Sequence, residues 1–289
     1  MEKKYKICFS ITVHEGIDFL EQQICLLCSL NPESAVVVHI AKQKNISEVE
    51  QKIIDKILGF GNVFFNTNRL NTLKYKILTP IVSNIEFSKD IDYEYLCLLA
   101  SNELPFRKNI YGYIKNYDYG SDLIISDGTV MSQAKHQDCV RFSNFCGMNG
   151  QTYTGQHEGT FYKKKLALQI SKKILEFCDL SLMNNLGDTT EESLLPTAVY
   201  CICNGLEKGR PISIIHERIP SLLGYNEFID FSRVIDFIGK MNDKNSLDFQ
   251  VSYNYTDTDL HFSFSVKRFR RDNSNGQVIE YIKDINNIK

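Results

Sequence analysis

The stretch IDYEYLCLLASNELPFR, residues 91–107, decides the fold that the sequence predicts. Within it, residues 95–100 form the continuous apolar run YLCLLA, which is typical of a strand buried on both faces of a mostly parallel sheet. The run ends at the polar residues Ser101, Asn102 and Glu103. Open α/β sheets bind ligands just beyond the carboxyl ends of their strands, so these three residues are binding candidates. Glu103 alone supplies a carboxylate there, which is a poor ligand set for a hard divalent cation.

Working outward, the alternation of strands and helices predicts an α/β fold with a mostly parallel central sheet flanked by helices. We expect strands at residues 5–13, 35–40 and 62–65 before the one at 95–100. Helices are expected over residues 17–30, from the N-cap Ser47 to about residue 57, and over 73–87, where Pro80 should kink or split the helix. Residues 1–105 would then form a nucleotide-binding half of a single domain covering residues 1–289.

The remaining half, residues 106–289, is expected to bind a second substrate. It should contain helices over residues 111–117, 161–177, 191–204, 234–241 and 277–285, of which the second is basic and amphipathic. A strand is expected at 122–126 and a strand or extended segment at 213–219, and residues 248–255 could pair with 261–269 as a hairpin. Residues 129–158 are rich in Gly, Gln, Asn and His, so we expect loops over the site there.

Composition narrows the class of protein. The chain has 289 residues, is 43% hydrophobic and carries a formal net charge of −2, which argues against a general nucleic-acid binder. Its nine cysteines show no regular spacing, and the pair Cys25 and Cys28 lies in an apolar helical pattern, which favours free thiols in a reducing cytosol. We expect no signal peptide and no transmembrane segment, hence a cytoplasmic protein for which contact with the inner face of a membrane stays open.

Two charged motifs admit a structural and a functional interpretation. Glu191 and Glu192 begin a predicted helix, where acids ordinarily complement the helix dipole, but Glu192 could instead be a general base. The run Lys267-Arg268-Phe269-Arg270-Arg271 is either a solvated basic edge strand or a clamp for a diphosphate.

The histidines are weaker signals. His39, flanked by apolar residues, is expected to be a core histidine, whereas His14, at a strand-to-helix turn, is a candidate ligand contact. His136, His157 and Glu158 lack metal-ligand spacing, and we expect no bound metal or other cofactor.

Taken in order, these motifs resemble the core-2/I-branching β-1,6-N-acetylglucosaminyltransferases, glycosyltransferase family 14, in a bacterial form. The likeness rests on residues 7–14 (ICFSITVH), 37–42 (VVHIAK), 95–106 (YLCLLASNELPF), 191–197 (EESLLPT) and 265–269 (SVKRF), with GTFY at 159–162 as a weaker match. It runs over most of the chain. It implies a GT-A-like nucleotide-binding fold and an inverting, metal-independent glycosyltransferase that builds bacterial surface polysaccharide such as lipopolysaccharide or capsule.

The resemblance also implies roles for particular residues. Glu192 matches the catalytic base, Arg268 matches the basic residue that contacts the donor diphosphate in place of a metal, and Lys267 is its neighbour in the motif; Arg270 is a further candidate. The substrates would be a nucleotide sugar, UDP-GlcNAc by default, and a glycan or lipid-linked glycan acceptor. Ala41 stands where the family has an aspartate, so another donor, such as a CMP-linked acid, stays open, as does an inactive nucleotide- or sugar-binding module.

Overall fold

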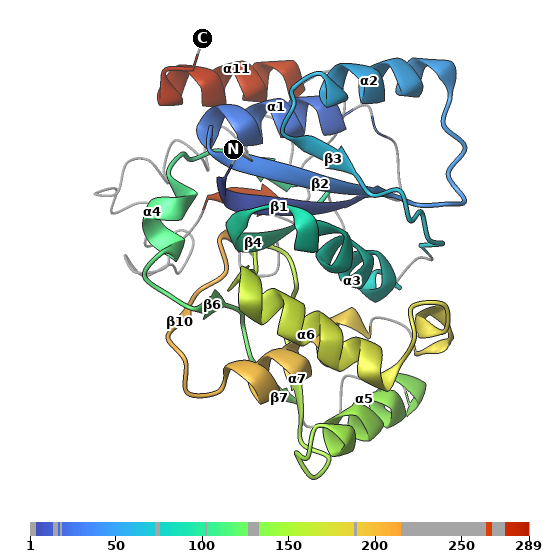
Figure 1. Cartoon of the computed structure of the whole chain (residues 1–289). Coiled ribbons are helices and arrows are strands. Elements are labelled where there is room, and N and C mark those ends of the chain that lie inside the picture. Colours follow the sequence, from blue (N-terminus) through green and yellow to red (C-terminus); the bar gives the residue numbers. More distant parts are fainter. Residues whose placement is uncertain are drawn as a thin grey trace.

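A seven-stranded sheet forms the centre of the computed structural model, with the strand order β10-β6-β9-β4-β1-β2-β3 (Figure 1). Its parallel part consists of β1 (Tyr5–Val13), β2 (Ser34–Ile40), β3 (Val63–Phe65) and β4 (Tyr93–Ala100). β9 (Phe161–Lys163) runs antiparallel between β4 and β6 (Tyr119–Gly120), and β10 (Lys208–Gly209) lies parallel to β6. The predicted α/β fold with a mostly parallel sheet is therefore confirmed.

The structure describes residues 4–13, 17, 19–72, 76–101, 103–126, 133–187, 190–214, 264–267 and 275–288. Among these residues, no helix is both long and apolar enough to cross a membrane.

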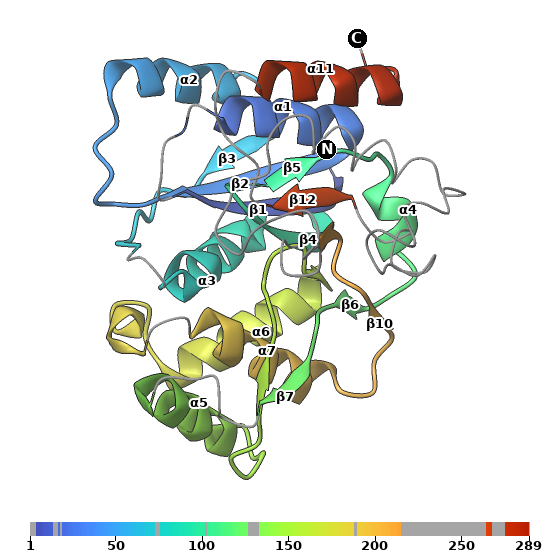
Figure 2. The same ribbon diagram turned by 180° about the vertical axis from the view of Figure 1, so that it is seen from behind.

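Helices cover both faces of the sheet (Figures 1 and 2). One face is covered by α1 (Leu20–Leu30), with α2 (Glu48–Leu58) and α11 (Asn275–Asn286) beside it. The other is covered by α3 (Leu78–Phe87) and α6 (Lys164–Phe177), beyond which α5 (Gln133–Phe145) and α7 (Glu191–Cys203) add a further layer. Because both faces are covered, every residue of β2 is buried, as expected for an apolar run in a parallel sheet.

Short elements complete the fold: α4 (Ile110–Ile114) and two 3-10 turns, η1 (Ser88–Asp90) and η2 (Met183–Asn185). The predicted N-cap of α2 is confirmed, because Ser47 Oγ accepts the N–H of Glu50 (3.2 Å) and Glu50 Oε2 accepts the N–H of Ser47 (3.0 Å). All nine cysteines are free thiols.

Two small sheets stand beside the main one. The first has the order β11-β12-β5, with β11 (Ser213–Ile214), β12 (Ser265–Lys267) and β5 (Glu103–Pro105) (Figure 2). The second pairs β7 (Ile124–Ser126) with β8 (Thr152–Thr154).

Several predicted boundaries are wrong. Residues 129–158 are not loops throughout, since α5 and β8 lie within them. Residues 161–163 form β9 rather than the start of a helix, because Phe161 and Tyr162 pack in the core beside β4. α3 begins only at Leu78, so Pro80 occupies its first turn, where a missing N–H costs no hydrogen bond, and does not split the helix.

The predicted hairpin is also wrong for Ser265–Lys267, which the structure describes as β12. β12 lies between β5 and β11 in the small sheet, so both of its edges are paired without residues 248–255. Residues 248–255 themselves, and the helix predicted at 234–241, lie outside the described residues.

Candidate functional site

The candidate site lies at the end of the sheet where β1, β2 and β4 finish, at Val13, Ile40 and Ala100. We call this the carboxyl end of the sheet. Of the residues predicted to bind there, Ser101 and Glu103 are described and buried, whereas His14 and Asn102 lie outside the described residues. The turn at Ser101 leads from β4 directly into β5.

Glu103 is fully buried and ties this turn together. Its Oε1 accepts the N–H of Ala100 (3.1 Å), and its Oε2 accepts the hydroxyl of Ser213 (2.8 Å). From α1, the Gln23 side chain donates to the carbonyls of Ala100 (2.9 Å) and Glu103 (2.8 Å). Glu103 therefore fixes the turn after β4 and attaches it to β11.

The cationic motif begins beside this carboxylate. β12 pairs antiparallel with β5 in a register that sets Lys267 opposite Glu103 and Val266 opposite Leu104. Because β12 is the central strand of its small sheet, the interpretation as a solvated edge strand does not hold for Ser265–Lys267. Arg268 and Arg270, like the Lys267 side chain, lie outside what the structure describes.

Residues 155–160 connect Glu192, the predicted base, to the carboxyl end of the sheet. At one end of this loop, the N–H of Gly155 donates to the carbonyl of Glu192 in the first turn of α7 (3.0 Å). At the other, the N–H of Gly159 donates to the carbonyl of Leu98 (2.8 Å), and the N–H of Leu98 donates to the carbonyl of Thr160 (2.9 Å). The loop thus joins α7 to the last residues of β4.

Glycine is required at both ends of the loop. A Cβ on Gly155 would lie 2.0 Å from the carbonyl oxygen of Asp122, and one on Gly159 would lie 2.3 Å from the backbone nitrogen of Ser213. Gly159 also has a φ of +70°, which other residues adopt only with strain. The close approach of three chain segments at the carboxyl end therefore depends on these two residues.

Buried acids gather around the loop. Glu158 is 4% exposed and its Oε1 lies 3.4 Å from Nε2 of His157, which is equally buried. In the first turn of α7, Glu191 is buried and Glu192 is half-buried. Charges are rarely buried without a structural or functional reason. His157, Glu158 and Glu191 thus join the candidate site.

This cluster was not predicted from the sequence. His157 and Glu158 lack metal-ligand spacing, and Glu191 stands at an ordinary helix start. The available signal was the pair of glycines, at 155 and 159, that bracket a His-Glu dipeptide in a polar segment.

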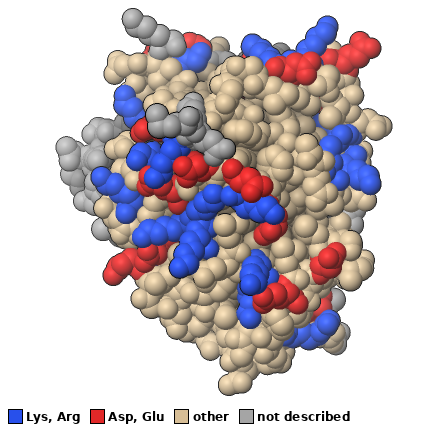
Figure 3. All heavy atoms as spheres, in the orientation of Figure 1, with Lys and Arg blue, Asp and Glu red and all other residues tan. Residues whose placement is uncertain are grey.

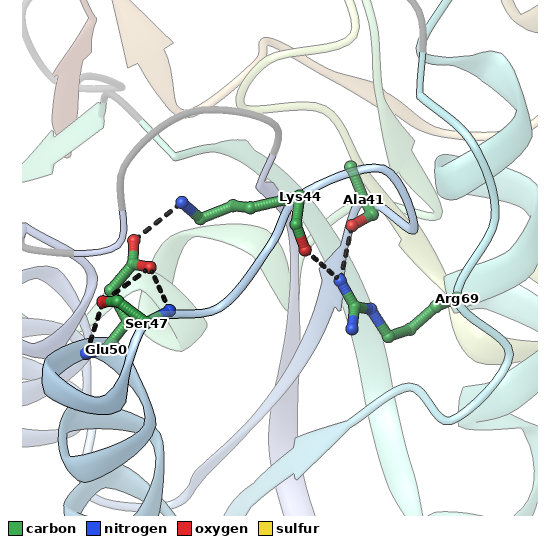
Figure 4. Close-up of polar contacts among 5 residues, drawn as sticks. All are labelled: Ala41, Lys44, Ser47, Glu50 and Arg69. Atoms are coloured by element: carbon green, nitrogen blue, oxygen red, sulfur yellow. Dashed lines mark hydrogen bonds and ion pairs between the residues drawn. The ribbon is translucent and has the colours of Figure 1, made fainter.

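The loops that follow β2 and β3 are fastened together at the same end of the sheet (Figure 4). The Arg69 guanidinium donates through Nη2 to the carbonyls of Ala41 (2.7 Å) and Lys44 (2.9 Å), and through Nε to that of Ile40 (3.2 Å). Lys44 in turn lies 2.7 Å from Glu50, and this contact, followed by the N–H of Ser47, lowers the pKa of Glu50 to about 2. A single cation thus orders the backbone that continues from β2.

His39 completes this arrangement from within β2. It is fully buried, as the sequence predicts, and its Nε2 accepts the N–H of Leu70 (3.0 Å). Burial, with a smaller contribution from the positive charge of Arg69, lowers the pKa of His39 to about 4. The imidazole is therefore neutral at pH 7 and acts as a structural acceptor.

Within the described part of the chain, no group of three or more His, Cys, Asp or Glu side chains is placed to hold a metal ion. No protein-family model matches this sequence, and no curated protein matches it either.

Proposed function

We propose that this chain is an inverting glycosyltransferase with a GT-A-like fold, which moves a sugar from a nucleotide sugar to a glycan hydroxyl. One observation supports this most directly. At the carboxyl end of the sheet, the turn at Ser101 leads into β5, which pairs with the cationic strand β12, and residues 155–160 run from this end to the first turn of α7, which carries Glu192. Such a reaction needs a donor site at the strand ends, fixed cations and a base.

The residues that the sequence predicted for the site each have a role in the proposed reaction. Glu192 removes the proton from an acceptor hydroxyl, whose oxygen attacks the anomeric carbon from the face opposite the nucleotide. The bond to the nucleoside diphosphate breaks, and the diphosphate leaves with the electron pair. Lys267, Arg268 and Arg270 stabilise its charge electrostatically, so the transfer needs no metal. Ser101, Asn102 and His14 contact the donor, while Glu103 holds the turn after β4 in place.

UDP-GlcNAc is the default donor, and the acceptor is a growing glycan, free or lipid-linked, of bacterial surface polysaccharide made in the cytoplasm. A donor panel tests this assignment. UDP is expected to raise the melting temperature more than GDP, CMP or dTDP do. Stabilisation by CMP would indicate that the donor is a CMP-linked acid. Stabilisation by UDP without turnover on any acceptor would indicate a binding module.

The decisive experiment replaces the base. Glu192→Gln should lower turnover of UDP-GlcNAc about a hundredfold or more, since general bases contribute on that scale, and should leave the melting temperature and UDP binding near the wild-type values. Glu176→Gln, at the exposed end of α6, is the control and should be fully active. Near-normal turnover by Glu192→Gln, or full loss of wild-type activity in EDTA with recovery on adding Mn²⁺, would contradict the proposed mechanism.

A further inference from the structure

The outer face of α6 carries a dense group of lysines. Segment 163–173, KKKLALQISKK, has five lysines and no acidic residue, although the chain as a whole has a net charge of −2. The buried apolar side chains of α6 are Leu166, Ala167, Ile170 and Ile174, which pack in the core, and most of the lysines lie on the other side of the helix. Figure 3 shows Lys and Arg side chains gathered in the middle of this face, where α6 runs in Figure 1, with Asp and Glu beside them.

Two of these lysines are held in place near the surface. Lys164 donates to the carbonyl of Ile91 (2.6 Å) and its ammonium lies 4.8 Å from the centre of the Tyr93 ring. Lys173 lies 4.7 Å from the centre of the Phe145 ring. The carbonyl of Ile91 and the Tyr93 ring are neutral partners, so they hold the Lys164 side chain without neutralising its charge.

Carboxylates balance only part of this charge. Asp118 pairs with Lys163 at 2.6 Å. Glu176 lies 3.9 Å from Lys172 and 3.8 Å from Lys173, which is longer than a hydrogen bond, and the Lys172 side chain is 77% exposed. Lys165 is exposed as well. Lys165 and Lys172 are therefore available to an anionic partner.

A shallow groove of about 550 Å³ runs between these lysines, lined by Lys164, Lys165, Leu168, Gln169 and Lys172. Proteins that bind single-stranded nucleic acid stack the bases on aromatic rings, and this lining offers none. It instead combines cationic tips, aliphatic lysine stems and the half-buried Leu168, a combination that suits the headgroup level of a lipid bilayer.

We infer that the outer face of α6 docks the protein on an anionic lipid bilayer. Each lysine near such a surface contributes about 1 kcal/mol of attraction, and the attraction falls off within a Debye length. The inference is independent of the transfer chemistry proposed above, because it uses none of the residues at the carboxyl end of the sheet.

Sedimentation of the full chain with lipid vesicles tests the inference. The protein should bind vesicles of phosphatidylcholine with phosphatidylglycerol, should not bind phosphatidylcholine alone, and should dissociate at about 0.5 M NaCl. Lys165→Glu should weaken binding about tenfold, and adding Lys172→Glu should weaken it further. Lys52→Glu makes the same charge reversal at an exposed position of α2, on the opposite face of the sheet, and should bind like the wild type.

Three outcomes would overturn the inference: equal binding to neutral vesicles, equal weakening by Lys165→Glu and Lys52→Glu, or retention on an acidic polysaccharide without binding to vesicles. Melting curves establish that each variant is folded. Should the double variant unfold, the single changes Lys165→Gln and Lys172→Gln give the same readout, each with about a fivefold loss.

Discussion

The two ends of β4 hold carboxylates in opposite ways. At the amino end, Glu94 is partly exposed and accepts a hydrogen bond from the Tyr111 hydroxyl (2.6 Å) and one from Lys6 (3.2 Å). The Tyr111 bond, and then Lys6, lower the pKa of Glu94. At the carboxyl end, Glu103 is fully buried and accepts from a backbone N–H and from Ser213. Water can replace the partners of Glu94, whereas the Ser213 hydroxyl that donates to Glu103 is buried with it.

This difference indicates which charged side chains the stability of the fold depends on. Exposed ion pairs contribute little to stability, because water and salt screen them and the side chains lose entropy. A buried carboxylate leaves its donors unsatisfied when it is removed, which costs much more. The carboxyl end of the sheet, where the candidate site lies, should therefore be far more sensitive to substitution than the amino end.

The largest expected effect is the loss of Glu103. Glu103→Ala removes the acceptor of the Ala100 N–H and of the buried Ser213 hydroxyl, which should lower the free energy of unfolding by about 3 kcal/mol or more. Glu94→Ala should cost about 1 kcal/mol or less. Urea unfolding followed by circular dichroism measures both values. Glu103→Gln keeps an acceptor for the Ala100 N–H, so its loss of unfolding free energy should lie between those of the two alanine variants. Equal losses for Glu94→Ala and Glu103→Ala would contradict the proposed difference between the two ends.

The same contrast explains which parts of the fold the sequence reveals. The runs at 35–40 and 95–100 are recognisable because strands buried on both faces are apolar throughout. Strands β5 and β12 are three residues long and pair only with distant segments, so no local period marks them. α5 escaped prediction because its sequence, QAKHQDCVRFSNF, is polar, and Cys139 and Phe142 are among the few apolar side chains that it buries.

The candidate site divides in the same way. The sequence alone predicted that the turn at residues 101–103 and the cationic run at 267–271 belong to the site. Only the structure shows the register of β5 and β12, which sets Lys267 opposite Glu103. The roles of Glu192, Arg268 and Arg270 remain predictions. Long-range pairing of short segments is set by packing and loop closure, which leave no periodic signal in the sequence.

A second, smaller effect should appear on acidification, through His39 near the end of β2. With a pKa of about 4 when folded and 6.5 when unfolded, His39 binds its proton more readily in the unfolded chain. Its contribution to the free energy of unfolding is therefore complete above pH 6.5 and is lost as the pH falls to about 4, by about 3 kcal/mol in all.

Urea titrations at a series of pH values measure this loss, with His39→Gln as the control. The glutamine can accept the Leu70 N–H but cannot titrate, so its stability should change less between pH 6.5 and 4.5 than that of the wild type. If the free energy of unfolding falls equally with pH in the wild type and in His39→Gln, another group is responsible for the loss of stability.

The smallest effect that still separates the two ends concerns a pair of glycines. Gly159, at the carboxyl end, has φ +70° and would place a Cβ 2.3 Å from the backbone of Ser213, whereas Gly61, just before β3 at the amino end, has φ +71° and nothing within 4 Å of that position. Alanine should therefore cost about 1 kcal/mol at Gly61, from backbone strain alone, and about 2 kcal/mol at Gly159, where β11 must also shift. Urea unfolding of Gly61→Ala and Gly159→Ala measures the difference. Backbone strain is common to both substitutions. An equal loss of stability would therefore mean that residues 155–160 and Ser213 can move apart at no cost in free energy. The carboxyl end would then be no more sensitive to substitution than the amino end.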